Sequence, residues 1–230
     1  MRMFRYFGVG VLMFLALTVG ARADSGPNDQ QIMIDQARST VQAFAAQPDM
    51  AEMRRLLGQS YGILIFPQIL KAGFIIGGSG GSGVLVGHDP NTGAWTAPAF
   101  FTMGSGSFGL QIGAEASQVV LLVMNRKALS AIINNKVKLG ADATVAVGPV
   151  GKGLGAGVTT AMNADIYTFA RSKGLFGGIS LSGSVVQGRD DWDQSYYGEP
   201  LNAAEIVLNR KVSAPAAAGL IQALGQAVIR

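Results

Sequence analysis

The sequence contains no cysteine and a single histidine, and these two shortages exclude several kinds of chemistry. Without cysteine the chain has no disulfide scaffold and no acceptor for lipoprotein acylation. One histidine, His88, is too few for a multi-histidine metal site. Charged residues make up only 14% of the 230 residues against 49% hydrophobic ones, so we expect a folded chain that buries a large core.

Patterns typical of catalytic sites are missing as well. His88 directly precedes Asp89 at the edge of the turn-forming stretch HDPNTGAW, where we expect a surface histidine. Ser105 and Ser107 alternate with other residues as strand hydroxyls do, and neither lies in a G-x-S-x-G elbow. We therefore predict that the protein is not an enzyme, and a serine hydrolase that uses Ser105 or Ser107 with His88 is the second of two alternative functions.

Acidic residues gather in one stretch, RDDWDQSYYGE, which superficially resembles a calcium-binding loop. An EF-hand loop requires glycine at its sixth position, but counting from Asp191 places Tyr196 there. We therefore predict no metal site. We expect instead a solvated turn whose aspartates cap a short helix, packed against the sheet by Tyr196 and Tyr197. The acidic residues of this stretch are Asp190, Asp191, Asp193 and Glu199.

The first 23 residues have the pattern of a cleaved signal peptide. Arg2 and Arg5 precede an apolar run over residues 6–20, and residues 21–23 supply the small-x-small pattern that signal peptidase cleaves. A transmembrane anchor is the alternative, but the run is shorter than the roughly 20 residues needed to cross a bilayer. We therefore expect a mature protein that begins at Asp24 and is periplasmic or secreted, in association with a membrane.

The composition is nearly neutral once this segment is set aside. Without Arg2, Arg5 and Arg22, 15 of the 18 basic residues remain against 14 acidic ones, which gives a formal charge of +1. The isoelectric point of about 9.5 for the whole sequence is therefore no argument for a nucleic-acid partner, and we predict none.

Helical and strand-like periodicities run through residues 24–230 without a linker, so we expect a single domain. Helices are expected over residues 29–47, 48–57, 125–134 and 214–230. Strands rich in Val, Ile, Phe and Gly are expected between residues 61 and 187, and the first of them, YGILIF, is expected to end at Pro67. The predicted fold class is α+β: a glycine-rich curved antiparallel sheet or small barrel with N-terminal helices, one inserted helix and a C-terminal helix.

Glycine is abundant, with 32 residues, and the stretch GGSGGSGVLVGHD at 77–89 contains the spacing G-x-G-x-x-G. A dinucleotide-binding fingerprint needs a helix after the glycines and an acidic residue about twenty positions further on. Here VLVGHD has no helical period and residues 91–107 contain no carboxylate, so we predict no nucleotide and no cofactor. Glycines within strands instead permit bulges and close approach of neighbouring strands.

Four longer stretches carry a family resemblance: KAGFIIGGSGGSGVLV, WTAPAFFTMGSGSFGLQIGAEASQVVLLVMN, KVKLGADATVAVGPVG, and NADIYTFARSKGLFGGISLSG with the later YYG. In this order, over residues 38–198, the chain resembles the SYLF domain family, whose members occur in plant FYVE proteins and in SH3-containing proteins of the endocytic actin patch. The resemblance implies lipid binding without catalysis. For an exported bacterial protein it implies a generic anionic phospholipid rather than phosphoinositides or actin.

Basic residues are the candidate ligands for lipid headgroups, because cations near an anionic bilayer contribute roughly 1 kcal/mol each. The alternative is that they are solvated residues at strand ends. The first alternative function is a structural or adhesive envelope protein that binds a protein partner through sheet edges or glycine-rich loops. The apolar face of helix 29–47 and the aromatic stretch WTAPAFF at 95–101 are expected to pack in the core; the alternatives are a helix that detaches to expose a lipid groove and aromatics that lie at a membrane interface. The predicted lipid-binding residues are Arg126, Lys127, Lys136, Lys138 and Lys173.

Overall fold

A computed structural model describes residues 29–73, 76–108, 113–134, 137–148, 164–172, 175–177 and 181–228. The helices are α1 (Asp29–Ala45), α2 (Ala51–Leu57), α3 (Arg126–Asn134), α4 (Asp190–Tyr197) and α5 (Ala218–Ala227), with the short turns η1 (Pro48–Met50), η2 (Ala204–Leu208) and η3 (Pro215–Ala217). The strands are β1 (Gly62–Gly73), β2 (Ile76–Asp89), β3 (Ala94–Trp95), β4 (Ala99–Phe108), β5 (Gly113–Val123), β6 (Val137–Lys138), β7 (Val145–Val147), β8 (Ile166–Ser172), β9 (Leu175–Gly177) and β10 (Val185–Gly188).

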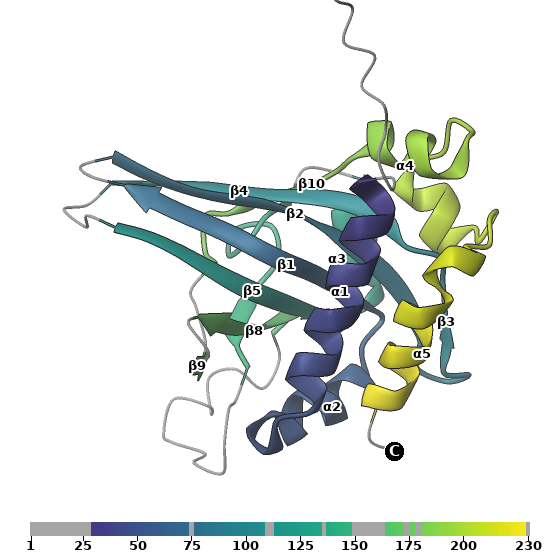
Figure 1. The fold of residues 1–230 in the computed structure, drawn as a ribbon, viewed down its shortest axis with the longest axis horizontal. Coiled ribbons are helices and arrows are strands. Elements are labelled where there is room, and N and C mark those ends of the chain that lie inside the picture. Colours follow the sequence, from purple (N-terminus) through teal and green to yellow (C-terminus); the bar gives the residue numbers. More distant parts are fainter. Residues whose placement is uncertain are drawn as a thin grey trace, which may run out of the picture.

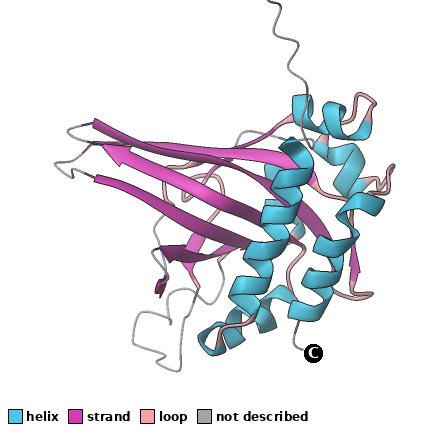
Figure 2. Cartoon of the chain, in the orientation of Figure 1, coloured by secondary structure: helices cyan, strands magenta, loops and turns pink. Residues whose placement is uncertain are grey.

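The strands form one curled sheet, and the helices gather at one end of it (Figures 1 and 2). The strand order is β6-β10-β4-β2-β1-β5-β8-β7, with β3 paired to β2 and β9 to β8. Only β7 and β8 pair in parallel among the described strands. The sheet stays open, with β6 and β7 at the ends of this order. The predicted α+β class, with a curved antiparallel sheet, is therefore confirmed.

Both faces of the sheet are buried where the helices lie. Along β1, Ile63 and Ile65 pack with α1 and α5, whereas Leu64 and Phe66 pack on the opposite face with α3. A strand buried on both faces needs no polar alternation, which explains the continuous apolar run in β1. α1 and α5 lie side by side, and β4, β2, β1 and β5 run on beyond them (Figure 1).

β1 does not end at Pro67, contrary to the sequence expectation, but continues to Gly73. Between Phe66 and Ile69, β1 advances by three residues while its partner β5 advances by only two. The pairing of β1 with β2 shifts at the same place. This is a β-bulge at Pro67 and Gln68. Because proline has no N–H to donate, a bulge is what allows it to lie within a central strand.

Two glycines of β2 face this bulge. A Cβ atom at Gly81 would lie 2.1 Å from the carbonyl oxygen of Gln68, and one at Gly83 would lie 2.2 Å from that of Ile65. Any larger residue would force the two strands apart. The expectation that strand glycines permit close approach is therefore confirmed for these positions.

The helices expected over residues 29–47, 48–57, 125–134 and 214–230 are present as α1, η1 with α2, α3, and η3 with α5. The apolar face of α1 packs on the sheet as expected, and Phe100 and Phe101 of the aromatic stretch are fully buried. Among the described residues, no helix is long and apolar enough to cross a bilayer. The expected signal peptide, residues 1–23, lies outside the described ranges.

Candidate functional site

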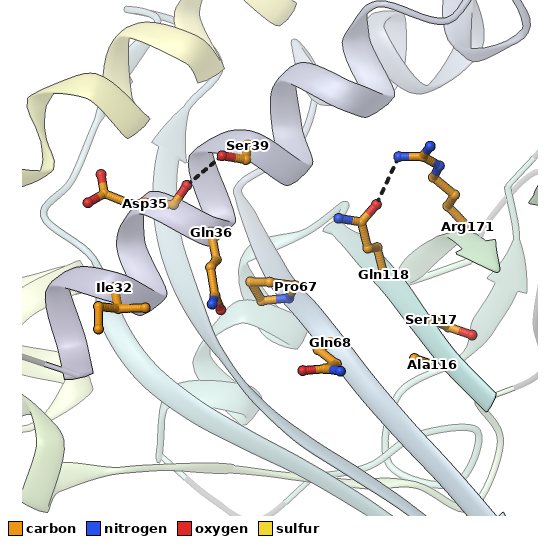
Figure 3. Close-up of a pocket in the computed structure, with 10 residues that line it drawn as sticks. All are labelled: Ile32, Asp35, Gln36, Ser39, Pro67, Gln68, Ala116, Ser117, Gln118 and Arg171. Atoms are coloured by element: carbon orange, nitrogen blue, oxygen red, sulfur yellow. Dashed lines mark hydrogen bonds between the residues drawn. The ribbon is translucent and has the colours of Figure 1, made fainter. Parts of the chain in front are cut away.

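A groove of about 620 Å³ lies between α1 and the bulged part of the sheet (Figure 3). One wall is the exposed side of α1, and the floor comes from β1, β5 and β8. Pro67 and Gln68 of the bulge lie at its centre (Figure 3). The lining residues are Ile32, Asp35, Gln36, Ser39, Pro67, Gln68, Ala116, Ser117, Gln118 and Arg171.

Arg171 gives the groove a positive end. Its Nη1 donates to Oε1 of Gln118 at 3.4 Å, and Nε2 of Gln118 donates to Oγ1 of Thr40 on α1 at 3.2 Å. Gln118 therefore connects the helix with the guanidinium group and fixes its position. Asp35, across the groove, is accompanied by Arg38 at 3.8 Å, in an ion pair exposed to solvent.

The other side of the groove is apolar and exposed. Ile32 is 41% exposed and Leu70 is 55% exposed. Leu70 pairs with Ala116, a lining residue, and residues directly opposite each other share a face of the sheet, so Leu70 lies on the side of the groove. Gly80 of β2 pairs with Leu70, and Gly104 of β4 pairs with Gly80. The face of the sheet that carries Leu70 therefore continues across β2 and β4 without side chains at these positions.

The glycines on this face are not required by packing. A Cβ atom at Gly104 would come no closer than 3.8 Å to another atom, and one at Gly106 would meet nothing within 4 Å. Side chains would fit at both positions. Their absence leaves a level strip of backbone beside the groove, unlike Gly81 and Gly83, where backbone contacts demand glycine.

His88 is buried, with 6% of its surface exposed, and is not the surface histidine that the turn sequence predicted. Its ring stacks on Trp95 at a centroid distance of 4.0 Å, and Nδ1 donates to the carbonyl oxygen of Ser60 at 2.8 Å. Burial lowers the pKa of His88, because the charged imidazolium is poorly solvated there. β2 runs on to Asp89 and pairs with β3, which covers the ring.

The serine hydrolase that the sequence left open is contradicted by the sheet register. Ser105 pairs with Ser79, and their hydroxyl oxygens lie 2.8 Å apart. His88 lies nine residues further along β2, or about 30 Å at the rise of a strand. Ser107 pairs with Gly77, further still from His88. Neither serine can therefore donate a proton to the histidine.

The predicted basic residues are distributed over the molecule. Arg126 lies in the first turn of α3, with its guanidinium carbon 5.5 Å from the ring centre of Tyr61, and Lys127 follows it. Lys138 lies beyond the other end of α3, whose nine residues span about 12 Å, on the strand β6. Lys136 and Lys173 lie outside the described residues. The lipid-binding role of all five stays a prediction.

A smaller pocket of about 260 Å³ lies where α3 meets the end of β2 and the segment after η2. Arg126, Arg210 and Asp89 line it, together with Tyr61 and Ser130. Arg210 was missed by sequence reasoning, since a lone arginine after Asn209 carries no local signal. Its backbone φ of 51° is in the left-handed region, the only such value for a non-glycine residue in the described chain.

The acidic stretch forms the expected short helix, α4, but not a solvated, aspartate-capped turn. Asp193 is fully buried, and its Oδ1 accepts the N–H of Phe100 at 2.9 Å. Burial raises the pKa of Asp193 to about 7, helped by the charges of Asp190 and Asp191. No side chain caps the N-terminus of α4. Tyr197 does pack the helix onto the sheet, donating to the carbonyl of Pro98 at 2.6 Å.

Sequence comparisons place this architecture among known domains. Residues 104–227 match the family model Ysc84, described as Las17-binding protein actin regulator. SH3 domain-containing YSC84-like protein 1 is 33% identical over 162 residues in Xenopus laevis and 32% over 161 residues in Homo sapiens, covering 70% of this chain and 48% and 46% of those proteins. Protein YSC84 of Saccharomyces cerevisiae is 30% identical over 159 residues, 68% of this chain and 34% of its own length. The chain spans about half the length, or less, of the curated relatives that it matches.

Proposed function

The chain belongs to the Ysc84 family of SYLF domains, and on this premise we propose that it binds phospholipid without catalysing a reaction on it. The family assignment confirms the resemblance seen in the sequence. We propose further that the protein is exported to a bacterial envelope, as the pattern of residues 1–23 suggests. In this proposal the groove beside α1 receives part of the lipid, and basic residues hold anionic headgroups.

The observation that supports the proposal most is the exposed apolar side of the groove. Ile32 and Leu70 leave large apolar side chains in solvent beside the level backbone strip of Gly80, Gly104 and Gly106. Exposed apolar surface of this kind typically marks a site for a ligand, a membrane or a partner protein. Acyl methylenes would lie along the strip, since no side chain there obstructs them.

The positive charge of Arg171 at the end of the groove suits the phosphate of a phospholipid. Arg171, held by Gln118, presents a guanidinium group, the side-chain type that best matches phosphate. Arg126, Lys127, Lys136, Lys138 and Lys173 would add long-range attraction to an anionic surface, at roughly 1 kcal/mol for each residue near it. The proposed ligand is therefore an anionic phospholipid, bound by its acyl chains in the groove and by its phosphate at Arg171.

The experiment is flotation of the protein with vesicles of neutral or anionic phospholipid at low and high salt. We expect Ile32→Asp and Leu70→Asp to abolish flotation, since each places a charge on the apolar side of the groove. Both side chains are exposed, so we expect both variants to fold as the wild type does. Val147→Asp is the matched control, because Val147 is 49% exposed on β7 and does not line the groove. Equal flotation of all three variants would contradict the role of the groove.

Salt dependence separates the two parts of the interaction. Binding that needs anionic vesicles and weakens at high salt would point to the basic residues, because salt screens exposed charges. Binding that resists salt would point to the acyl chains in the groove. Arg171→Gln removes the charge, and we expect it to weaken the preference for anionic over neutral vesicles without abolishing binding to either.

A protein partner is the second candidate, and the description of the family supports it. That description names Las17 binding, which is a protein interaction of family members. Sheet edges or the glycine-rich strands would be the contact surface of this chain. Absence of flotation with every vesicle, together with a folded protein, would favour this candidate over phospholipid.

A further inference from the structure

The pocket of about 260 Å³ beside α3 contains charges of both signs that do not neutralise one another directly. Arg126 and Arg210 contribute two guanidinium groups and Asp89 one carboxylate. In the described part of the chain, no ion pair joins any of these three residues to another charged group. The pKa of Asp89 is lowered, mainly by the N–H of Asn91 and also by the charge of Arg210, so the carboxylate is ionised at neutral pH.

Arg210 is held there at a cost to the backbone. A left-handed conformation costs an L-residue roughly 1–2 kcal/mol, and glycine avoids this cost. Both neighbours are fixed by hydrogen bonds, from Asn209 N–H to the carbonyl of Ala204 and from Lys211 N–H to the carbonyl of Glu205. The turn therefore needs this backbone conformation but not an arginine. Strained residues of this kind gather at functional sites, so the strain at Arg210 directs attention to the role of its side chain.

We propose that this pocket binds a zwitterionic phosphate ester of the ethanolamine type. The phosphate would lie between the guanidinium groups of Arg126 and Arg210, which suit its oxygens. The ammonium group would face Asp89, and the short carbon link would lie against Leu129 and the Tyr61 ring. A purely anionic phosphate would contact the same two arginines but would be repelled by the carboxylate of Asp89. The carboxylate therefore favours a ligand that carries an ammonium group.

Two sources share this chemistry: the headgroup of a phospholipid and a free soluble ester. The lipid source rests on the proposed function, whereas the soluble one does not. The pocket adjoins Gly87, which pairs with Gly62 of β1, while the groove adjoins Leu70, eight residues or about 26 Å further along β1 from Gly62. The two sites are therefore separate and can be tested separately.

Calorimetric titration with glycerophosphoethanolamine tests the pocket. Glycerophosphocholine, whose amine has no N–H to donate, and glycerophosphate, which has no amine, are expected to bind less tightly. Arg210→Gly should weaken binding of the ethanolamine ester about tenfold or more, since a charge-assisted hydrogen bond is lost. Its melting temperature should stay the same or rise. Lys211→Gln removes a neighbouring charge outside the pocket and should bind as the wild type does.

Asp89→Asn keeps an oxygen for the N–H of Asn91, the main hydrogen bond of the turn. It should reverse the preference, with glycerophosphate binding at least as tightly as the ethanolamine ester. No binding of the ester by the wild type, or equal binding by Arg210→Gly, overturns the proposal. The proposal is also overturned if Asp89→Asn and the wild type prefer the ethanolamine ester over glycerophosphate to the same degree.

Vesicles then identify the source. Stronger flotation with phosphatidylethanolamine than with phosphatidylcholine, lost in Arg210→Gly, supports the lipid headgroup. Binding of the soluble ester, together with equal flotation on phosphatidylethanolamine and phosphatidylcholine vesicles, supports a free ester as the ligand. If Arg210→Gly and the wild type both fail to bind the soluble ester but still float through the groove, the pocket proposal fails and the proposed function stands.

Discussion

The buried carboxyl of Asp193 makes the stability of the fold depend on pH in an unusual direction. Its pKa is raised from 3.8 to about 7, mainly by burial. The folded state therefore binds this proton more tightly than the unfolded state does. The contribution of this carboxyl to stability is greatest below about pH 4 and is lost as the pH rises towards 7, where the charged group must stay in the core.

The size of the effect follows from the shift. A shift of about three pKa units corresponds to about 4 kcal/mol between the two protonation states. Asp193→Asn removes the charge and keeps an oxygen to accept the N–H of Phe100. We expect the variant and the wild type to unfold with similar free energies below about pH 4, where the carboxyl is protonated in both the folded and the unfolded state, and the variant to be more stable by about 2–4 kcal/mol above pH 8.

The assay is urea unfolding followed by tryptophan fluorescence over this pH range. His88 also titrates, and its lowered pKa adds stability as the pH rises to about 6.5. That contribution is common to both proteins and cancels in their difference. A difference that stays constant with pH would refute the reasoning, because the titrating group would then not be Asp193.

The core and the close strand contacts lead to three further predictions. Gly83→Ala should cost about 3 kcal/mol or more in urea unfolding, because a Cβ atom would lie 2.2 Å from the Ile65 carbonyl, while Gly106→Ala should change stability by less than about 0.5 kcal/mol. Phe44→Ala should lower the free energy of unfolding by about 3–5 kcal/mol, since the ring is fully buried beneath α1. His88→Ala should lower it by about 2 kcal/mol in the same assay, because a buried hydrogen bond and a ring stack are lost.

Local periodicity was enough to predict most of the fold. α1 and α3 each carry their apolar residues at helical spacing, so their position and their buried face followed from the sequence. Pro67 was misleading, because a local rule ends a strand at proline whereas the paired strands on both sides accommodate it in a bulge. That accommodation depends on the glycines of β2, which are distant in sequence.

The candidate sites were harder to predict because distant residues create them. The turn signal beside His88 gave no hint that Trp95 and the Ser60 carbonyl would enclose the ring. Asp193 lies in the most acidic stretch of the chain, yet it is buried against the beginning of β4, where it accepts the N–H of Phe100. Arg126 was predicted from its neighbours in sequence, but the arginine that joins it in the pocket, Arg210, lies 84 residues further along the chain.

The bulge at Pro67 and Gln68 interrupts the pairing of β1 with both of its neighbours, so we expect the parts of the sheet on its two sides to open independently. On one side, β1 is covered on both faces, and we expect its amides to open only with global unfolding. On the other side, none of the described helices covers the glycine-rich ends of the strands (Figure 1), and we expect their amides to exchange hydrogen far faster. Because the interruption affects the pairing with both neighbours, fraying of the open end need not spread into the core. The end of the sheet at which we propose that lipid binds can therefore be mobile while the folded core stays intact.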